Sequence, residues 1–486
     1  MREYAAVFDA GTTAIKGALV DGGGRIVASA SGDLDLIVDD GVREQAPEQW
    51  WRVMCEVAHT MLYDAALDDH DFNTPRIAGI IFSGQMQDVI ALDTDLHPVR
   101  NAILYSDGRA AAQADALADA YSGGRGRFLA TVGNRLEGCL PLPKLMWMRD
   151  HEPDAFAWTS HVLISSKDYL IARLAGVTVG DVAACSTAGA MGIRTGRWSG
   201  ELCAAAGIEA SLLPQLHRPQ DIVGQVTAAA AEATGFAAGT AVYAGIGDAG
   251  ATTFASGVTR PGQYNINLGT SGWIATVSSE PFVNKPGAAN LAFGVTDGFV
   301  NAVPFLNAGD VHRWATGLFA DGDYERAHDL IEAAAPGANG VLCLPYLVGE
   351  RFPVMNPTVR GAYVGLSPAT SAGDMLRAAL EGVAFSIRQG MASFDEPPTS
   401  ISLIGGGARE TAWCQIMADT LHHPVEVFAN ADILPAVALA SLVFDRPDLV
   451  ATVAETTYQP DPAAARAYDA LYPRFVALYP AVAPLG

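Results

Sequence analysis

The first residues with recognisable chemistry lie in residues 4–21, YAAVFDAGTTAIKGALVD. An apolar strand leads to Asp9, Gly11, Thr12 and Thr13, and a second, alternating strand follows. Gly11 permits a tight bend, where backbone N–H groups and two hydroxyls can surround an anionic oxygen. A carboxylate such as Asp9 beside phosphates requires a cation between them, which predicts Mg²⁺. Taken alone, the stretch also fits an ordinary polar turn.

The same pattern returns far along the chain in residues 263–277, QYNINLGTSGWIATV. A strand runs into Gly269, Thr270, Ser271 and Gly272, and another strand leaves. Structural turns have no reason to recur with the same hydroxyl pair. The repeat therefore predicts two hairpins, one in each of two domains, that hold the phosphates of one nucleotide.

Asp248 lies in a glycine-rich stretch that contains a formal G-x-G-x-x-G at Gly245, Gly247 and Gly250. That pattern is used by dinucleotide-binding proteins, but they need an acidic residue about 20 positions later for the ribose. Here the second hairpin occupies that place. We therefore interpret Asp248 as a carboxylate at a junction between domains, a position that is also compatible with a helix N-cap.

Further polar groups follow three predicted strands. Strand 77–83 ends in Ser83-Gly84-Gln85-Met86-Gln87-Asp88, and strand 102–105 leads through Tyr105 to Asp107-Gly108-Arg109. Polar side chains at neighbouring strand ends predict the walls of one pocket. Strand 401–404 meets three glycines and Ala408 before a helix at 411–421, which would put bare backbone against a flat or anionic group.

The elements that must position these groups indicate an α/β protein. Apolar stripes predict helices at 47–65, 143–148, 168–174 and 226–234, and a third strand at 26–31 follows the first hairpin. The longest apolar run, 433–444, contains Pro435 and is too short to span a bilayer. A chain of 486 residues exceeds a usual single core, so we expect two domains.

Charge and cysteine content narrow the class of protein. With 53 acidic and 30 basic residues, the formal charge of −23 disfavours nucleic acid and anionic membranes as partners. Phosphate binding must therefore rest on local donors, on Lys16 and on Mg²⁺. The six cysteines lack C-x-x-C spacing, and the chain begins with a strand rather than a signal peptide, so we expect a cytoplasmic protein with free thiols.

Taken in order, these motifs resemble the FGGY family of carbohydrate kinases, and they are most similar to its xylulokinase branch. The stretch 360–381, RGAYVGLSPATSAGDMLRAALE, and the segment 344–351 around Gly349-Glu350-Arg351 add to the resemblance, which covers nearly the whole chain. The resemblance implies an α/β fold of two actin-like (ribonuclease H-like) ATPase domains with an interdomain cleft. We expect the domains to span residues 1–246 and 247–486.

The resemblance also implies roles for individual residues. Asp248 matches the catalytic base, and Asp9 matches the carboxylate associated with Mg²⁺. The candidate ATP-binding residues are Gly11, Thr12, Thr13, Lys16, Gly269, Thr270, Ser271, Gly272, Gly405, Gly406, Gly407 and Ala408. The candidate sugar-binding residues are Gln85, Met86, Gln87, Tyr105, Asp107 and Asp248.

The expected function is ATP-dependent phosphorylation of a primary hydroxyl of a ketopentose, with D-xylulose first. Gln87-Asp88, Tyr105 and Ala249 depart from the xylulokinase pattern, so D-ribulose, L-ribulose, L-xylulose, tetritols and pentitols stay open as substrates. Asp9 as the base is the alternative assignment. A sugar- or nucleotide-sensing relative without catalysis is the alternative of another class. The sequence does not fix the oligomeric state, for which a homodimer is one option.

Overall fold

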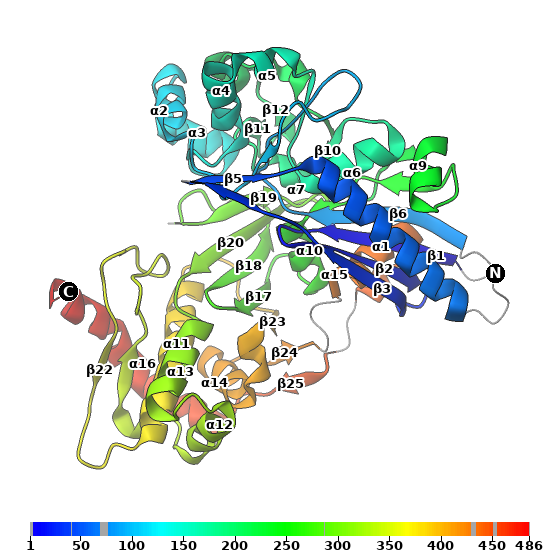
Figure 1. Cartoon of the computed structure of the whole chain (residues 1–486). Helices are drawn as coiled ribbons and strands as arrows, with labels where there is room; N and C mark the ends of the chain where they lie inside the picture. The colour runs from blue at the N-terminus through cyan, green and yellow to red at the C-terminus, as the bar shows by residue number, and fades with distance from the viewer. Residues whose placement is uncertain are drawn as a thin grey trace.

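The computed structural model describes residues 3–39, 41–68, 76–285, 287–428, 434–450 and 454–485. It contains two seven-stranded sheets, each packed with helices, and Figure 1 shows them as two α/β bodies. This architecture confirms the predicted α/β class. No helix within the described ranges combines the length and the apolar character needed to cross a membrane.

The N-terminal sheet is built around the first hairpin. Its strand order is β14-β15-β6-β1-β2-β3, with β16 paired to β6. The strands are β1 (Glu3–Ala10), β2 (Ala14–Asp21), β3 (Ile26–Asp33), β6 (Arg76–Gly84), β14 (Ile222–Gln225), β15 (Ala241–Tyr243) and β16 (Ile246–Gly247). Strands β1, β2 and β3 form an antiparallel meander, whereas β6 runs parallel to β1, β15 and β16. The predicted hairpin is confirmed.

Helix α1 (Pro47–Asp68) covers one face of this sheet, beside α6 (Ser166–Ala175) and α9 (Ala228–Thr234). The helix approaches closely because the strands below it present glycine. A Cβ on Gly17 would lie 2.6 Å from a methyl group of Val57, and one on Gly32 would lie 2.6 Å from a methyl group of Val53. The core between these layers contains Trp50, which is fully buried.

A helical lobe extends the N-terminal part beyond its sheet. Its helices are α2 (Ala111–Ala120), α3 (Gly124–Val132), α4 (Pro141–His151), α5 (Pro153–Trp158), α7 (Val182–Cys185) and α8 (Gly200–Ala206). Short strands connect them: β4 (Ile37–Asp39), β5 (Val42–Gln45), β7 (Ile90–Leu92), β8 (Ala102–Ile103), β9 (His161–Leu163), β10 (Val179–Asp181), β11 (Met191–Gly192), β12 (Arg197–Trp198) and β13 (Gln215–His217). The prediction of a strand through Tyr105 was wrong, because β8 ends at Ile103 and the Tyr105 N–H donates to the Asp88 carboxylate.

The C-terminal sheet has the order β19-β20-β18-β17-β23-β24-β25. Its strands are β17 (Gln263–Leu268), β18 (Gly272–Ser278), β19 (Ala289–Ala292), β20 (Phe299–Phe305), β23 (Ser400–Ile404), β24 (Val425–Val427) and β25 (Thr456–Tyr458). The accompanying elements are α11 (Gly309–Phe319), α12 (Tyr324–Ala333), β21 (Leu342–Leu344), β22 (Ala362–Val364), α13 (Ala372–Met391), α14 (Thr411–Leu421) and α16 (Pro462–Val482). The second predicted hairpin is thus confirmed as β17 and β18.

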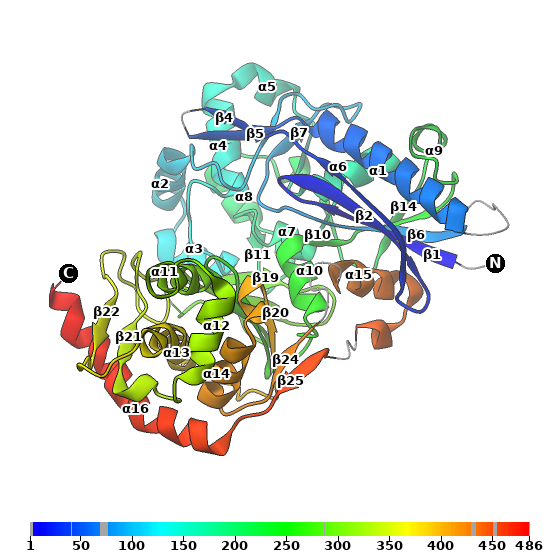
Figure 2. The same cartoon turned by 60° about the horizontal axis from the view of Figure 1, so that its bottom comes forward.

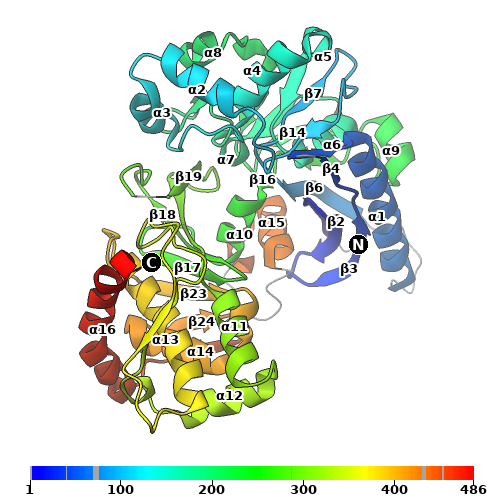
Figure 3. The ribbon, with the colours of Figure 1, turned by 60° about the vertical axis from the view of Figure 1, so that its left-hand side comes forward.

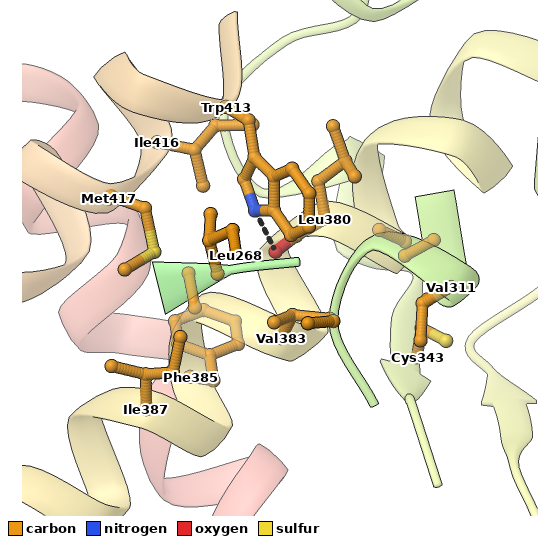
Figure 4. Close-up of a cluster of buried hydrophobic side chains, with 14 of the residues drawn as sticks. Leu268, Val311, Cys343, Leu380, Val383, Phe385, Ile387, Trp413, Ile416 and Met417 are labelled. Carbon is orange, nitrogen blue, oxygen red and sulfur yellow. Dashed lines mark hydrogen bonds between the residues drawn. The ribbon is translucent and has the colours of Figure 1, made fainter. Parts of the chain in front are cut away.

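Figure 4 shows how this core fixes the end of β17. Leu268, the last residue of the strand, lies among apolar side chains of α13 and α14. The indole N–H of Trp413 donates to the carbonyl of Leu380 at 3.2 Å, which ties α14 to α13. The chain that follows Leu268, the Gly269–Gly272 turn, therefore starts from a rigid point.

Two helices lie between the sheets. Helix α10 (Asp248–Ala255) and helix α15 (Leu434–Phe444) pack against each other, and Figures 2 and 3 show them side by side at the junction. Although α15 comes late in the chain, it packs on β1 and β6 of the N-terminal sheet. Phe254, Leu439 and Val300 share one buried cluster with strands of both sheets. Of the apolar run 433–444, residue 433 lies outside the described residues.

Candidate active site at the strand ends

The turn of the first hairpin is held by its neighbours. The Thr12 hydroxyl donates to Gln85 Oε1 at 2.8 Å, and the Thr12 carbonyl accepts from Gln45 Nε2 at 2.7 Å. The carbonyl of Thr13 accepts from the N–H of Leu34, while its side chain is exposed. Two hydroxyls were predicted to bind phosphate. The Thr12 hydroxyl is hydrogen-bonded to Gln85, whereas the Thr13 side chain faces solvent.

Asp9 lies near the end of β1, directly across the hairpin from Lys16. Its Oδ1 accepts a hydrogen bond of 2.7 Å from the hydroxyl of Ser83 on β6. Asp9, Lys16, Ser31 and Ser83 line a cavity of about 350 Å³, whose wall also includes Ala436 of α15. Asp9 and Lys16 therefore share one cavity, whose remaining wall combines serine hydroxyls with apolar side chains.

The register of three parallel strands brings Asp248 to the same edge as Asp9. Asp9 pairs with Ser83, and Ser83 pairs with Ile246, so the three residues form one row across β1, β6 and β16. Gly247 ends β16, and Asp248 begins α10 one residue later. A Cβ on Gly247 would lie 2.0 Å from Met86 Sδ, so only glycine fits between the sugar-side loop and α10.

The environment of Asp248 changes its acidity. Asp248 is exposed by its accessible surface, yet the protein packed around its carboxyl removes enough water to raise its pKa to about 7. The charge of Asp9 also raises this pKa, as does that of Asp181 to a smaller extent, and a hydrogen bond from the Ala249 N–H opposes them. A carboxyl that is half ionised near neutral pH is suited to accept a proton from an alcohol.

The predicted sugar-side residues follow β6 as expected. Gln85 is buried, and its Nε2 donates to Gln45 Oε1 at 3.0 Å. Met86 packs on Gly247, immediately before Asp248. Gln87 has a φ of 66°, a left-handed conformation that is uncommon for a residue with a side chain. The loop that the sequence predicted as a pocket wall is thus held in one specific conformation.

Lys144, which was not predicted from the sequence, joins the two sugar-side strand ends. Its buried ammonium group donates to the carbonyls of Gln87 at 3.1 Å and Leu104 at 2.6 Å. Burial lowers the pKa of Lys144 and raises that of Asp88, which is fully buried nearby and accepts from the Tyr105 N–H. A lysine inside the apolar segment PLPKLMW of α4 was the available signal.

Asp107 is fully buried and engaged within the protein. It accepts from the Arg43 N–H at 2.7 Å and from the guanidinium of Arg109 at 2.9 and 2.6 Å. Burial acts to raise the pKa of Asp107, but these donors hold it below its usual value. Tyr105, by contrast, is 42% exposed. Tyr105 therefore faces solvent, whereas Asp107 is a structural residue that holds the loop after β8 through its hydrogen bonds.

The predicted nucleotide loops of the C-terminal part meet in a second cavity of about 1000 Å³. Gly269, Thr270, Gly406 and Gly407 line it, together with residues of α11 and α12. The Gly309 N–H donates to the Gly269 carbonyl at 2.8 Å, so the turn is fixed to the start of α11. Asp9 and Lys16 of the first hairpin line the smaller cavity described above, whereas its turn residues Gly11, Thr12 and Thr13 are not among the residues that line either cavity.

Other members of the predicted set support the cavity wall rather than line it. A Cβ on Gly405, whose φ is 92°, would lie 2.7 Å from the carbonyl carbon of Leu268. Gly272 starts β18 against the ring of Phe305, and the carbonyl of Ala408 accepts from the Cys414 thiol. Ser271 is exposed beside them. These residues bring the glycine loop and the second hairpin together.

The sequence analysis also missed charged and aromatic residues of this cavity. His312 lies in its wall, almost fully buried, and packs edge-on against Trp413 at 5.7 Å between ring centroids. His328 and Glu410 form an ion pair of 2.8 Å at the same wall, and Glu410 raises the pKa of His328. Isolated histidines in helical sequence carry no spacing signal, so only the fold identifies them.

Comparisons with known proteins identify the family of this chain. The N-terminal domain of the FGGY family of carbohydrate kinases matches residues 4–255, and the C-terminal domain of that family matches residues 264–440. The chain is 32% identical to the xylulose kinase of Bacillus subtilis (strain 168), covering 88% of this chain and 85% of that protein.

Solved structures are similar over nearly the whole length. The structure of xylulose kinase from Rhodospirillum rubrum matches with a TM-score of 0.87 at 30% identity, covering 99% of each chain. That of gluconate kinase from Lactobacillus acidophilus matches with a TM-score of 0.85 at 25% identity, also covering 99% of each chain. These matches confirm the resemblance and the two-domain fold predicted from the motifs.

Proposed function

Because the chain belongs to the FGGY family of carbohydrate kinases, it is a phosphotransferase, and we propose that it transfers the γ-phosphoryl group of ATP to a primary hydroxyl of D-xylulose. The observation that carries the assignment is the row of β1, β6 and β16, which places Asp248 beside Asp9 at one edge of the sheet. The raised pKa of Asp248, about 7, supports its role as the base.

In the proposed mechanism Asp248 accepts the proton of the sugar hydroxyl while that oxygen attacks the γ-phosphorus. General-base help of this kind contributes about 10²–10⁴-fold to the rate. The phosphoryl group itself needs mainly positioning and charge neutralisation. On the N-terminal side, Lys16 is the proposed donor from the cavity that Asp9 also lines. The backbone of the first turn, residues 11–13, is a second proposed donor, because it follows Asp9 along the chain.

The second hairpin and the glycine loop would hold the nucleotide. Gly406 and Gly407 leave the wall of the 1000 Å³ cavity without side chains, which fits the flat face of an adenosine. Asp9 fits as the carboxylate for Mg²⁺, because the Ser83 hydroxyl orients it. Asp248 is a second carboxylate nearby, and a cation would offset the repulsion between the two. When bound, Mg²⁺ would neutralise the charge of the phosphates.

The comparisons and the charge of the sugar side support D-xylulose. The xylulose kinase of Bacillus subtilis (strain 168) is 32% identical over 88% of this chain, and the gluconokinase of the same strain is 28% identical over 98% of it, so sequence identity but not coverage favours a xylulose kinase. Gluconate carries a carboxylate and would need a free cation. Two cations of the predicted sugar side are already engaged: Arg109 pairs with Asp107 and Glu44, and the buried ammonium group of Lys144 donates to two backbone carbonyls. A neutral ketose suits this site better.

A panel assay tests the proposal. ADP release would be measured with D-xylulose, D-ribulose, L-ribulose, L-xylulose, pentitols, tetritols and gluconate. We expect the highest kcat/KM for D-xylulose, by at least about tenfold, since one lost hydroxyl contact costs roughly 1–3 kcal/mol. A higher kcat/KM for another compound would identify that compound, rather than D-xylulose, as the substrate. Absence of turnover with all of them would favour the alternative of a sensing protein without catalysis. Because the reaction consumes ATP, we propose that it takes place in the cytoplasm.

A further inference from the structure

Three consecutive side chains at the start of α6 each donate to a backbone carbonyl of a different segment. Ser165 Oγ donates to the Gln85 carbonyl at 2.7 Å, and Ser166 Oγ donates to the Ala10 carbonyl at 2.6 Å. Lys167 Nζ donates to the Ala244 carbonyl at 3.1 Å. All three donor residues are fully buried. We call Ser165, Ser166 and Lys167 the α6 clamp.

The three acceptors belong to the segments that carry the proposed catalytic and binding groups. Ala10 directly follows Asp9 on β1, and Gln85 follows the end of β6. Ala244 lies between β15 and β16, shortly before Asp248. The clamp therefore reaches the backbone next to the proposed metal carboxylate, the proposed sugar wall and the proposed base.

The start of α6 also lies directly against the end of β6. A Cβ on Gly84 would be 2.7 Å from Ser166 Oγ and 3.1 Å from the backbone nitrogen of Lys167. The close approach means that a small shift of α6 would move the strand ends with it. Since protein interiors are close-packed, such a shift is not absorbed by empty space.

Lys167 is part of a buried ion cluster. Its ammonium group lies 2.6 Å from Asp168 Oδ1 and 2.8 Å from Asp181 Oδ2, and all three side chains are fully buried. Burial acts to lower the pKa of Lys167, but the two carboxylates raise it, so the lysine stays charged. Asp181 Oδ1 accepts from the N–H groups of Ala183 and Ala184 at the start of α7. Buried ion pairs contribute little net stability, which favours a positional role for this one.

We propose that the α6 clamp positions the reacting groups, and that Ser165 acts mainly on the KM for the sugar, whereas Ser166 and Lys167 act mainly on kcat. This inference rests on the proposed role of Asp248 as the base. Ser165 fixes the sugar wall through Gln85. Ser166 fixes the backbone beside Asp9, and Lys167 fixes the segment that leads to Asp248. All three side chains are fully buried and donate to backbone carbonyls, so we interpret them as positioning residues rather than catalytic ones.

Single variants assayed with D-xylulose and ATP test the clamp. Ser165→Ala should raise the KM for the sugar about tenfold, because the wall is displaced. Ser166→Ala should lower kcat about tenfold with little change in KM for the sugar, and Lys167→Met should lower kcat about 100-fold, as expected for a displacement of about 1 Å. Lys167→Arg should recover part of the loss, because it keeps the charge.

Ser441→Ala is the matched control. Its hydroxyl is equally buried and donates to the Ala438 carbonyl of its own helix at 2.6 Å, away from the strand ends. Thermal unfolding measures the structural cost of each substitution. If Ser165→Ala and Ser166→Ala lower Tm as Ser441→Ala does but leave kcat and KM unchanged, the clamp has only a structural role and the inference is wrong. These serine variants decide the question even if Lys167→Met does not fold.

Failure of the proposed function would look different. If Asp248→Asn kept near-normal turnover, Asp248 would not be the base, irrespective of the kinetics of the serine variants. Asp248→Asn without turnover, together with unchanged kinetics of both serine variants, would retain the base and reject the clamp. The two ideas are thus separated by one set of purified variants.

Discussion

The pH dependence of turnover gives the sharpest test of the site. With a pKa of about 7, Asp248 is about one tenth ionised at pH 6 and about nine tenths ionised at pH 8. If the ionised form is the base, kcat/KM for the sugar should rise about tenfold for each pH unit below 7 and level off above it. Asp248→Asn should lower kcat by about 10²–10⁴-fold and remove this acidic limb from the residual rate.

Asp9→Asn distinguishes the two candidate bases. The charge of Asp9 raises the pKa of Asp248, so its removal should move the acidic limb to lower pH even if the rate falls. If Asp9 were the base, the same variant would abolish the limb, and Asp248→Asn would leave it in place. Initial rates between pH 5 and 9, with ATP saturating and sugar well below KM, separate the outcomes. A wild-type profile that is flat from pH 5 to 8 would refute the assignment of a carboxyl with a pKa near 7.

Three further predictions concern stability and binding. Asp248→Asn should raise Tm relative to wild type, by an amount that grows from pH 5 to pH 8. The pKa of Asp248 is higher in the folded than in the unfolded protein, so the wild type loses stability as pH rises toward 7. A difference in Tm that stays constant with pH would contradict this. Gly405→Ala should lower Tm and weaken ATP binding. The backbone of Gly405, with φ 92° and ψ 175°, lies in a region that is essentially restricted to glycine and costs another residue roughly 1–3 kcal/mol, and the new Cβ would contact Leu268. Gly406→Ala, whose Cβ would meet no atom within 4 Å, should keep the Tm of wild type. Lys144→Met should raise the KM for the sugar about tenfold, since it releases the carbonyl of Gln87 and the loop after β6, and unchanged sugar kinetics would contradict this.

Much of the local structure was predictable because it depends on short-range pattern. Alternating apolar residues around Gly-Thr turns predicted both hairpins. The glycines after strand 401–404 were predicted to bring bare backbone against a bound group; Gly406 and Gly407 line the larger cavity, whereas Gly405 lies against the backbone of Leu268. Individual side-chain directions were less predictable. The hydroxyl of Thr12 donates a hydrogen bond to Gln85, a residue 73 positions away, and no local sequence pattern could indicate this contact.

The same limit explains the residues that were missed. Lys144 and the α6 clamp act through backbone carbonyls, and a carbonyl has the same chemistry at every position of the chain. The residue types along the chain therefore do not indicate which carbonyls these side chains contact. His312 and the pair of His328 with Glu410 are similar cases, because their place in the cavity wall follows from the packing of α11 and α12.

The sequence by itself determined which chemical groups are available: two carboxylates beside glycine turns, a glycine loop after a strand, and a family whose motifs occur in order. Only the tertiary structure decided which of them share an edge, because strand register, not spacing along the chain, puts Asp9, Ser83 and Ile246 in one row. It also decided the acidity of Asp248, since burial and a neighbouring charge depend on residues that are distant in sequence.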